Sequence, residues 1–128
     1  MTDDVKKKID VVFIAGGKFH DIDFARLEIL KLLAEDDRMK TRVFEDYSNL
    51  HAIENADFLI TYTCDVRPTL EQQRVLKNYV ASGNRWLALH GTNSILQFMS
   101  DGKVDSPRIA PVMMETLGSQ FIAHPPIE

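Results

Sequence analysis

Hydrophobic positions along the chain alternate between short apolar runs and longer stretches with helical spacing. The run IDVVFIA, residues 9–15, is rich in β-branched side chains and stops at a glycine pair, a pattern typical of a buried strand. The last such run, WLAL, is continuous, which predicts a strand covered on both faces. Together these runs predict four strands, at residues 9–15, 41–44, 58–63 and 86–89.

Helical spacing fills the longest gaps between these strands. Apolar residues recur three and four positions apart over residues 24–33, which predicts a helix that Asp23 caps and that ends near residues 36–37. Weaker patterns predict short helical segments at residues 50–55, 95–99 and 113–117.

A further helix precedes the fourth strand. Thr69 with Gln72 three positions later is a capping-box pattern, and Gly83 is placed to end the helix. Strands and helices therefore follow one another in the order expected of the α/β class. We predict a mainly parallel, twisted sheet with helices on both faces and right-handed crossovers.

Chain length and tail bear on the domain organisation. The 128 residues fit one α/β domain, residues 1–128. Four strands are few for a sheet of this class, and the prolines in FIAHPPIE prevent a regular helix or central strand there. We expect either a further strand in the tail or a chain that is the amino-terminal part of a longer domain, with the sheet incomplete at its carboxyl-terminal end.

Composition narrows the function classes. A formal net charge of -4 and a sequence pI near 5.5 argue against binding to a nucleic-acid backbone. No segment approaches the roughly 20 apolar residues that cross a bilayer, so no membrane association is expected. A single cysteine, Cys64, excludes an internal disulfide and suits a reducing compartment, so a cytoplasmic location is predicted. We interpret Cys64 as a buried small apolar residue.

Three histidines fall where this sheet would bind a ligand. His20 follows the first strand, His90 ends the fourth, and His124 lies in the terminal loop. Ligands of open α/β sheets bind outside the carboxyl ends of the strands, and imidazole suits zinc and similar divalent ions. We therefore predict a site for a divalent metal such as zinc. No two of these histidines have close metal-site spacing, so backbone-bonded or exposed histidines are the alternative.

Residues beside the histidines complete the candidate site. Asp21 and Asp65 could ligate metal, orient an imidazole or act as a general base. Four small residues, by contrast, are predicted to bind substrate, partly through backbone N–H groups: Gly16, Gly17, Gly91 and Thr92. Neither a GxGxxG nor a GxxxxGK[ST] motif is present, so no nucleotide cofactor is expected.

Three segments together resemble one protein family. They are IAGGKFHD, TLEQQRVLKNYVASGNRWLALHGT and GSQFIAHP, spread over nearly the whole chain. This arrangement is similar to the ThuA-like (trehalose-utilisation) family. The resemblance implies a class I glutamine amidotransferase-like fold, a flavodoxin-like three-layer sandwich. His90 would occupy the turn where the amidotransferases carry their nucleophilic cysteine, so glutamine hydrolysis is not expected.

The resemblance also implies a substrate class. ThuA-like proteins are associated with carbohydrate utilisation, so a sugar-derived ligand such as trehalose or a related keto-sugar is expected. Metal-assisted isomerisation or hydrolysis is one hypothesis. A metal-free hydrolase or isomerase with His90 as general base is a second. A non-catalytic binding or assembly module is a third, and homo-oligomerisation through a sheet edge stays open.

Overall fold

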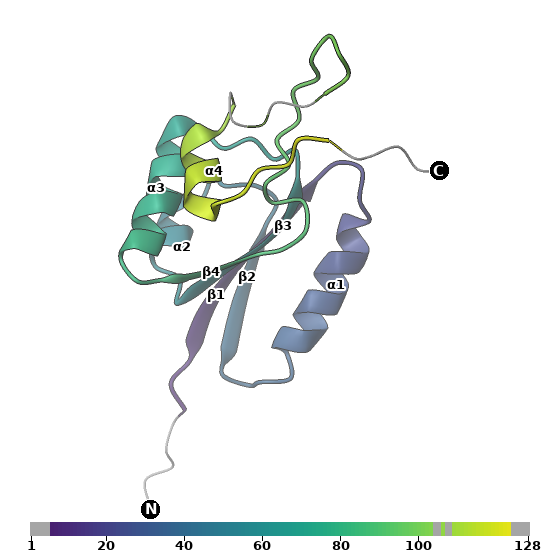
Figure 1. Ribbon diagram of the computed structural model, residues 1–128. Helices are drawn as coiled ribbons and strands as arrows, with labels where there is room; N and C mark the ends of the chain where they lie inside the picture. The colour runs from purple at the N-terminus through teal and green to yellow at the C-terminus, as the bar shows by residue number, and fades with distance from the viewer. Residues whose placement is uncertain (1–5, 104–105, 107–108, 124–128) are drawn as a thin grey trace, which may run out of the picture.

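The computed structural model describes residues 6–103, 106 and 109–123. Its centre is a sheet of four parallel strands in the order β2-β1-β3-β4 (Figure 1). The strands are β1 (Ile9–Gly17), β2 (Met39–Phe44), β3 (Phe58–Cys64) and β4 (Arg85–Ala88). The helices are α1 (Ile22–Leu33), α2 (Leu50–Glu54), α3 (Leu70–Ala81) and α4 (Pro111–Leu117).

Helices cover both faces of the sheet, which makes the flavodoxin-like three-layer α/β fold that the sequence predicts. In Figure 1, α1 lies on one side of the sheet, and α2, α3 and α4 lie together on the other. Each described crossover joins parallel strands, as the alternation of apolar runs and helical stretches indicates.

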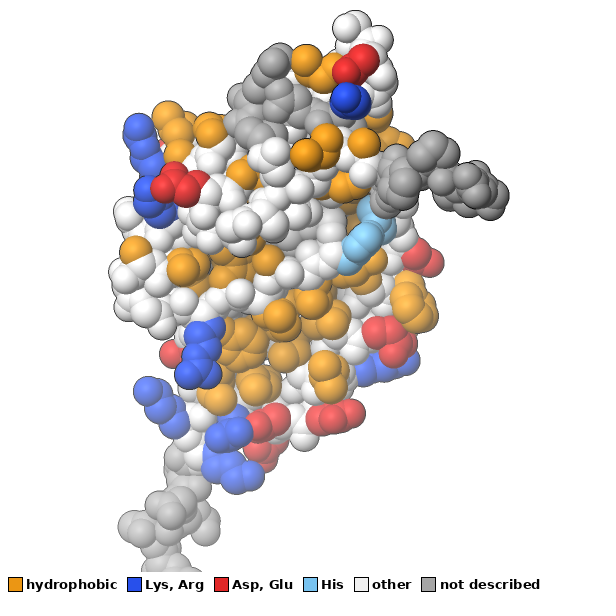
Figure 2. Space-filling model, in the orientation of Figure 1, with side chains coloured by type: hydrophobic (Ala, Val, Ile, Leu, Met, Phe, Trp, Pro, Cys, Tyr) orange, Lys and Arg blue, Asp and Glu red, His pale blue; other side chains and the backbone are white. Residues whose placement is uncertain are grey.

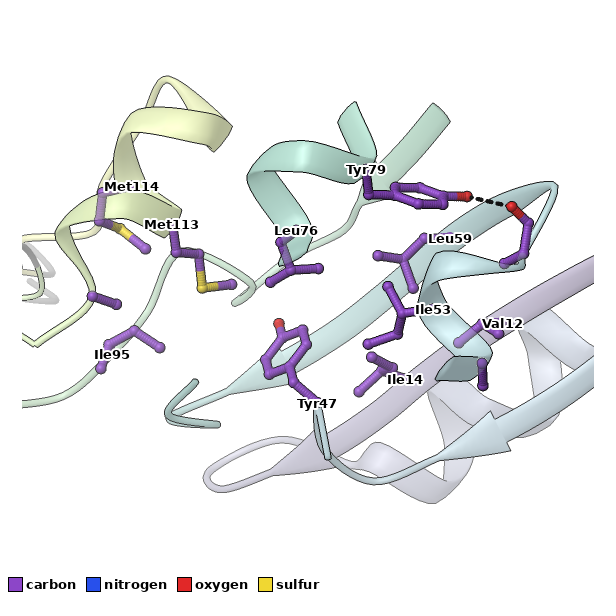
Figure 3. Close-up of a cluster of buried hydrophobic side chains, with 13 residues drawn as sticks. Val12, Ile14, Tyr47, Ile53, Leu59, Leu76, Tyr79, Ile95, Met113 and Met114 are labelled. Carbon is purple, nitrogen blue, oxygen red and sulfur yellow. Dashed lines mark hydrogen bonds between the residues drawn. The ribbon is translucent and has the colours of Figure 1, made fainter. Parts of the chain in front are cut away.

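The central strand β1 divides the core into two clusters, because successive side chains of a strand point to opposite faces. Val12 and Ile14 pack toward α2, α3 and α4, the cluster drawn in Figure 3. Val11, Phe13 and Ala15 pack toward α1. All five are fully buried, so β1 is fixed in the middle of the sheet.

Strand β4 is more exposed than its apolar run predicts. Trp86 packs into the cluster with α3 and α4, but the Leu87 side chain is 54% exposed and Ala88 is also exposed. The prediction of cover on both faces is therefore wrong. Within the described residues β4 pairs only with β3, so it is an edge strand, and hydrophobic side chains gather around it in Figure 2. An apolar run indicates a strand but does not specify what packs on it.

Several predicted boundaries shift. Asp21, not Asp23, caps α1: its Oδ1 accepts the Phe24 N–H at 2.9 Å, and Asp23 pairs with Arg26 instead. Helix α1 ends at Leu33, earlier than predicted, and β2 starts at residue 39 instead of 41. The short helix predicted from residue 113 is confirmed, although it begins at Pro111.

Residues 95–99 do not form the predicted helix. The Leu96 N–H is donated to the Asp65 carboxylate and the Ile95 N–H to the Ser106 hydroxyl, so these backbone groups bond outside the segment. Ile95 and Leu96 are nevertheless buried, which explains their apolar spacing.

The further strand considered for the tail falls largely on residues 124–128, outside the described part of the chain. Across that described part, no helix has the length and apolar character needed to cross a membrane.

Candidate functional site

Two histidines distant in sequence meet at the carboxyl edge of the sheet. His20 lies in the loop between β1 and α1, and His90 follows β4. Their Nε2 atoms are 2.9 Å apart although the residues are 70 positions apart, and their ring centroids are separated by 4.8 Å. His20 is half-buried and His90 is exposed, so the pair faces solvent. The convergence of these two predicted residues is the strongest chemical feature of the described structure.

One backbone contact indicates the tautomer of His20. The His20 Nδ1 lies 3.0 Å from the Lys18 carbonyl oxygen, and a carbonyl can only accept, so Nδ1 carries a proton. A neutral His20 ring then presents the lone pair of Nε2 to His90, whose Nε2–H donates. A hydrogen bond of this kind on the far nitrogen is also how proteins orient metal-binding imidazoles. Tyr62 of β3 lies beside both rings, with centroid distances of 6.2 and 6.3 Å.

Two glycines bring the histidine loops against the end of β3. Gly17 has φ +107°, and a Cβ there would lie 1.9 Å from the Cys64 carbonyl oxygen. Gly91 has φ +84°, and its Cβ would lie 2.1 Å from the Thr63 carbonyl oxygen. Only glycine satisfies both the left-handed dihedral and the close approach. The two turns therefore converge because backbone packs directly on backbone.

A buried carboxylate joins the loops beneath the histidines. Asp65 accepts hydrogen bonds from Lys18 Nζ at 3.1 Å, Arg67 Nε at 3.2 Å and the Leu96 N–H at 3.0 Å. These three partners come from the loops after β1 and β3 and from the segment after β4. The Asp65 side chain is only 5% exposed, so its oxygens are committed to holding the loops together.

The pKa of Asp65 reflects this network. Burial alone raises the pKa of the carboxyl, but the Leu96 N–H and the positive charges of Lys18 and Arg67 outweigh burial and hold the pKa below its usual value. Asp65 is therefore an ionised anchor. Its burial and its three donors do not favour the role of general base.

Buried hydroxyls anchor the turn that carries His90. The Thr92 hydroxyl lies 2.8 Å from the Thr61 hydroxyl of β3, and Trp86 Nε1 donates to the same Thr61 oxygen at 3.0 Å. Thr92 is almost fully buried. Its side chain therefore joins the turn to the sheet, which favours a structural role over the substrate contact predicted for it.

A cavity of about 490 Å³ opens beside the histidine pair. His20, His90 and Asn93 supply polar lining, and Gly91 also lies on its wall. Most of the remaining lining is apolar: Phe19, Cys64, Leu96, Phe98, Phe121 and Ala123. Its volume falls within the roughly 300–1,000 Å³ typical of small-molecule sites. In the view of Figure 2, the visible histidine atoms lie at the surface beside hydrophobic side chains.

A second, smaller cavity of about 320 Å³ adjoins the first. It shares His90, Gly91 and Asn93 with the larger cavity and adds Thr92 and Ser119. Asn93 Nδ2 donates to the Ser119 hydroxyl at 3.1 Å. His90 therefore stands between an apolar cavity and a polar one.

The other predicted site residues have structural contacts. Asp21 caps α1, and Gly16 is buried, where a Cβ would lie 2.1 Å from the Glu45 carbonyl oxygen. Neither lines the cavity. Gly17 pairs with β3 through Cys64. His124 lies outside the described residues. Among the residues the structure describes, no group of three or more His, Cys, Asp or Glu is placed to hold a metal ion.

Cys64 is buried as predicted, although it borders the cavity. Burial raises the pKa of its thiol, and the negative charge of Asp65 raises it further. At neutral pH the side chain is therefore a thiol, which is a poor nucleophile.

Sequence reasoning missed the aromatic lining. The position of Phe19 directly before His20 could have indicated that its side chain lies at the candidate site. Phe98 has no such signal, because its segment has the spacing of a helix and its place on the cavity depends on tertiary structure.

Comparison of the chain with protein-family models, curated proteins and solved structures finds no match in any of the three.

Proposed function

We propose that this chain is a ThuA-like protein of carbohydrate utilisation that handles a sugar-derived substrate, such as trehalose or a related keto-sugar, in the cytoplasm. Its site would be built on a divalent ion such as zinc, held by His20 and His90, with His124 as third ligand. The observation that carries the proposal is the 2.9 Å separation of the two Nε2 atoms in the lining of a ligand-sized cavity.

The donor set fits a divalent ion. Two imidazole nitrogens at Zn–N distances of about 2.0–2.1 Å in a tetrahedral site lie roughly 3.3 Å apart, close to the separation found here. The Lys18 carbonyl holds His20 in the tautomer that leaves a lone pair on Nε2; metal binding would replace its hydrogen bond with His90, whose Nε2 would have to give up its proton.

Such an ion would polarise a substrate carbonyl or activate water. The protein's own residues would do the positioning. His20 and His90 orient the site, Asp65 fixes the loops that carry the ligands, and the cavity receives the remainder of the substrate.

Metal analysis of the 128-residue chain tests the proposal. Wild type purified without chelator is expected to carry close to one equivalent of a divalent metal, and His90→Ala and His20→Ala are expected to lose it. His51→Ala is the matched control, because His51 is exposed on α2 and bonds only locally, with Asn55. Metal content that is absent in wild type, or unchanged in His90→Ala, would exclude this function.

A second candidate is a metal-free hydrolase or isomerase with His90 as general base. The same Nε2 contact supports it as an N–H···N hydrogen bond, in which His20 accepts from His90 and tunes its orientation. An activity whose pH profile has a limb between about pH 5 and 8, and which survives exhaustive chelation, would favour this candidate over the metal site.

A third candidate is a non-catalytic binding or assembly module, which the exposed edge strand β4 supports. Unpaired strand edges can add a strand from another chain. Light scattering that finds a concentration-dependent dimer, together with full function of the His20→Ala and His90→Ala variants, would favour it. A monomer at all concentrations would count against edge pairing.

A further inference from the structure

Three phenylalanines line the cavity beside the histidine pair. We refer to Phe19, Phe98 and Phe121 as the phenylalanine wall. The side chains of Phe19 and Phe98 are 75% and 70% exposed, while Phe121 is half-buried. Large aromatic side chains usually stabilise a fold by burial, so two that are mostly in water contribute little to this core.

Phe19 also has an unfavourable backbone conformation. Its φ of +62° lies in the left-handed region, which bulky side chains rarely adopt. Glycine or asparagine would suit this position better, and a polar residue would suit its exposure. Backbone strain at a residue adjoining a candidate ligand, His20, is typical of functional sites. The aromatic ring at position 19 thus has no evident structural purpose, and its position points to a ligand.

Polar groups line the cavity together with the phenylalanines. His90 and Asn93 line both this cavity and the adjoining polar concavity, so they mark the boundary between the two, and Asn93 donates to the Ser119 hydroxyl of the polar one. A ligand spanning this boundary needs one apolar surface and a separate polar edge. A pyranose sugar has both, since its axial C–H bonds form an apolar face and its hydroxyls surround the ring.

We propose that the phenylalanine wall is a stacking subsite for a pyranose ring. The ring would lay its C–H face on Phe19 and Phe98 and direct its oxygen-bearing edge toward His20 and His90. This inference rests on the proposed sugar function and adds which residues select the ring and which face they contact. It separates sugar selection, by the aromatic wall, from metal binding, by the histidines.

Saturation-transfer NMR on the full chain tests the subsite directly, with methyl β-D-glucopyranoside as probe. Its H1, H3 and H5 protons share one face, so wild type is expected to saturate them at least about twofold more than H2 and H4. Phe98→Ala and Phe19→Ala should each weaken probe binding at least about tenfold, and Phe98→Trp should preserve it. Phe24→Ala is the control, because Phe24 is 63% exposed on α1 and does not line the cavity.

Zinc titration of the same variants separates the two proposals. Unchanged zinc binding in Phe98→Ala with lost sugar binding supports a dedicated sugar wall. Equal saturation of all ring protons, undiminished sugar binding in the phenylalanine variants, or absence of sugar binding in a zinc-binding wild type would each overturn the stacking subsite. Preference for an aromatic probe such as phenol over the glucoside would overturn it as well. A wild type that binds the glucoside but no zinc would overturn the metal site alone.

Discussion

Two groups of polar side chains share the carboxyl edge of this sheet, and they differ in how fully their hydrogen-bonding capacity is used. Asp65 is 5% exposed and accepts from three donors on three segments. His90 is exposed, and its side chain bonds to the His20 ring. A buried group held by several donors holds a fold together, whereas an exposed group with a single partner can bind a ligand. Position at a strand end therefore does not by itself identify a functional residue.

The largest effect should come from Gly91→Ala, in the turn beneath His90. The new Cβ would lie 2.1 Å from the Thr63 carbonyl oxygen at φ +84°. We expect a loss of about 3–4 kcal/mol in the free energy of unfolding, measured by urea denaturation, because backbone must move. Gly83→Ala is the control: its φ is +91° but nothing lies within 4 Å, so only about 1–2 kcal/mol should be lost. Equal losses in the two variants would contradict the close-packing account.

Asp65→Ala should give the next largest effect. It removes a buried acceptor from the Leu96 N–H and from two cations, so we expect about 2–3 kcal/mol of lost stability. Lys18 and Arg67 are mostly exposed, and water can solvate them once freed, which keeps the loss below that of a fully buried pair. Asp21→Ala, which removes only a helix cap, should lose about 1 kcal/mol. The same loss from both variants would argue that Asp65 is no anchor.

Acid titration sharpens the role of Asp65. Because its folded pKa lies below the ordinary value of 3.8, the ionised carboxylate stabilises the fold above that pH, and the contribution is lost as pH falls through the lower folded pKa. The difference in free energy of unfolding between wild type and Asp65→Asn should therefore be constant near neutral pH and shrink below about pH 4. A difference that grows toward low pH would contradict the sign of this shift.

The smallest effect on stability should come from the histidines. Truncation of His20 or His90 to alanine removes mostly solvated atoms, so the free energy of unfolding should change by no more than about 0.5 kcal/mol. Thermal or urea unfolding of the metal-free variants measures this. A loss above about 2 kcal/mol in the free energy of unfolding would show that the histidine pair stabilises the fold, as Asp65 does, and would contradict the comparison between them.

The sequence predicts much of this arrangement because the signals are local. Apolar runs locate the four strands, and the strand ends place His20 and His90 at one edge. Apolar patterns give wrong predictions where the environment of a residue depends on tertiary neighbours. Leu87 is as apolar as a central strand residue yet lies on an edge, and Leu96 has helical spacing because it is buried in an irregular segment.

The helix cap and the aromatic lining are single-residue features that the sequence pattern also does not determine. Asp21 and Asp23 are both suitable caps, and only the backbone conformation at residue 21 decides between them. Phe98 reaches the cavity through a segment with no regular structure, so no periodicity could place it there.

The most direct test of the central claim, that His20 and His90 are two ligands of one ion, is a double-mutant cycle of zinc affinity by titration calorimetry on the metal-free chain. If both rings bind the same zinc, each single alanine variant should lose at least about 100-fold in affinity, and the double variant should lose little more. Zinc affinity that is unchanged in either single variant, or that falls additively in the double variant, would contradict a shared site.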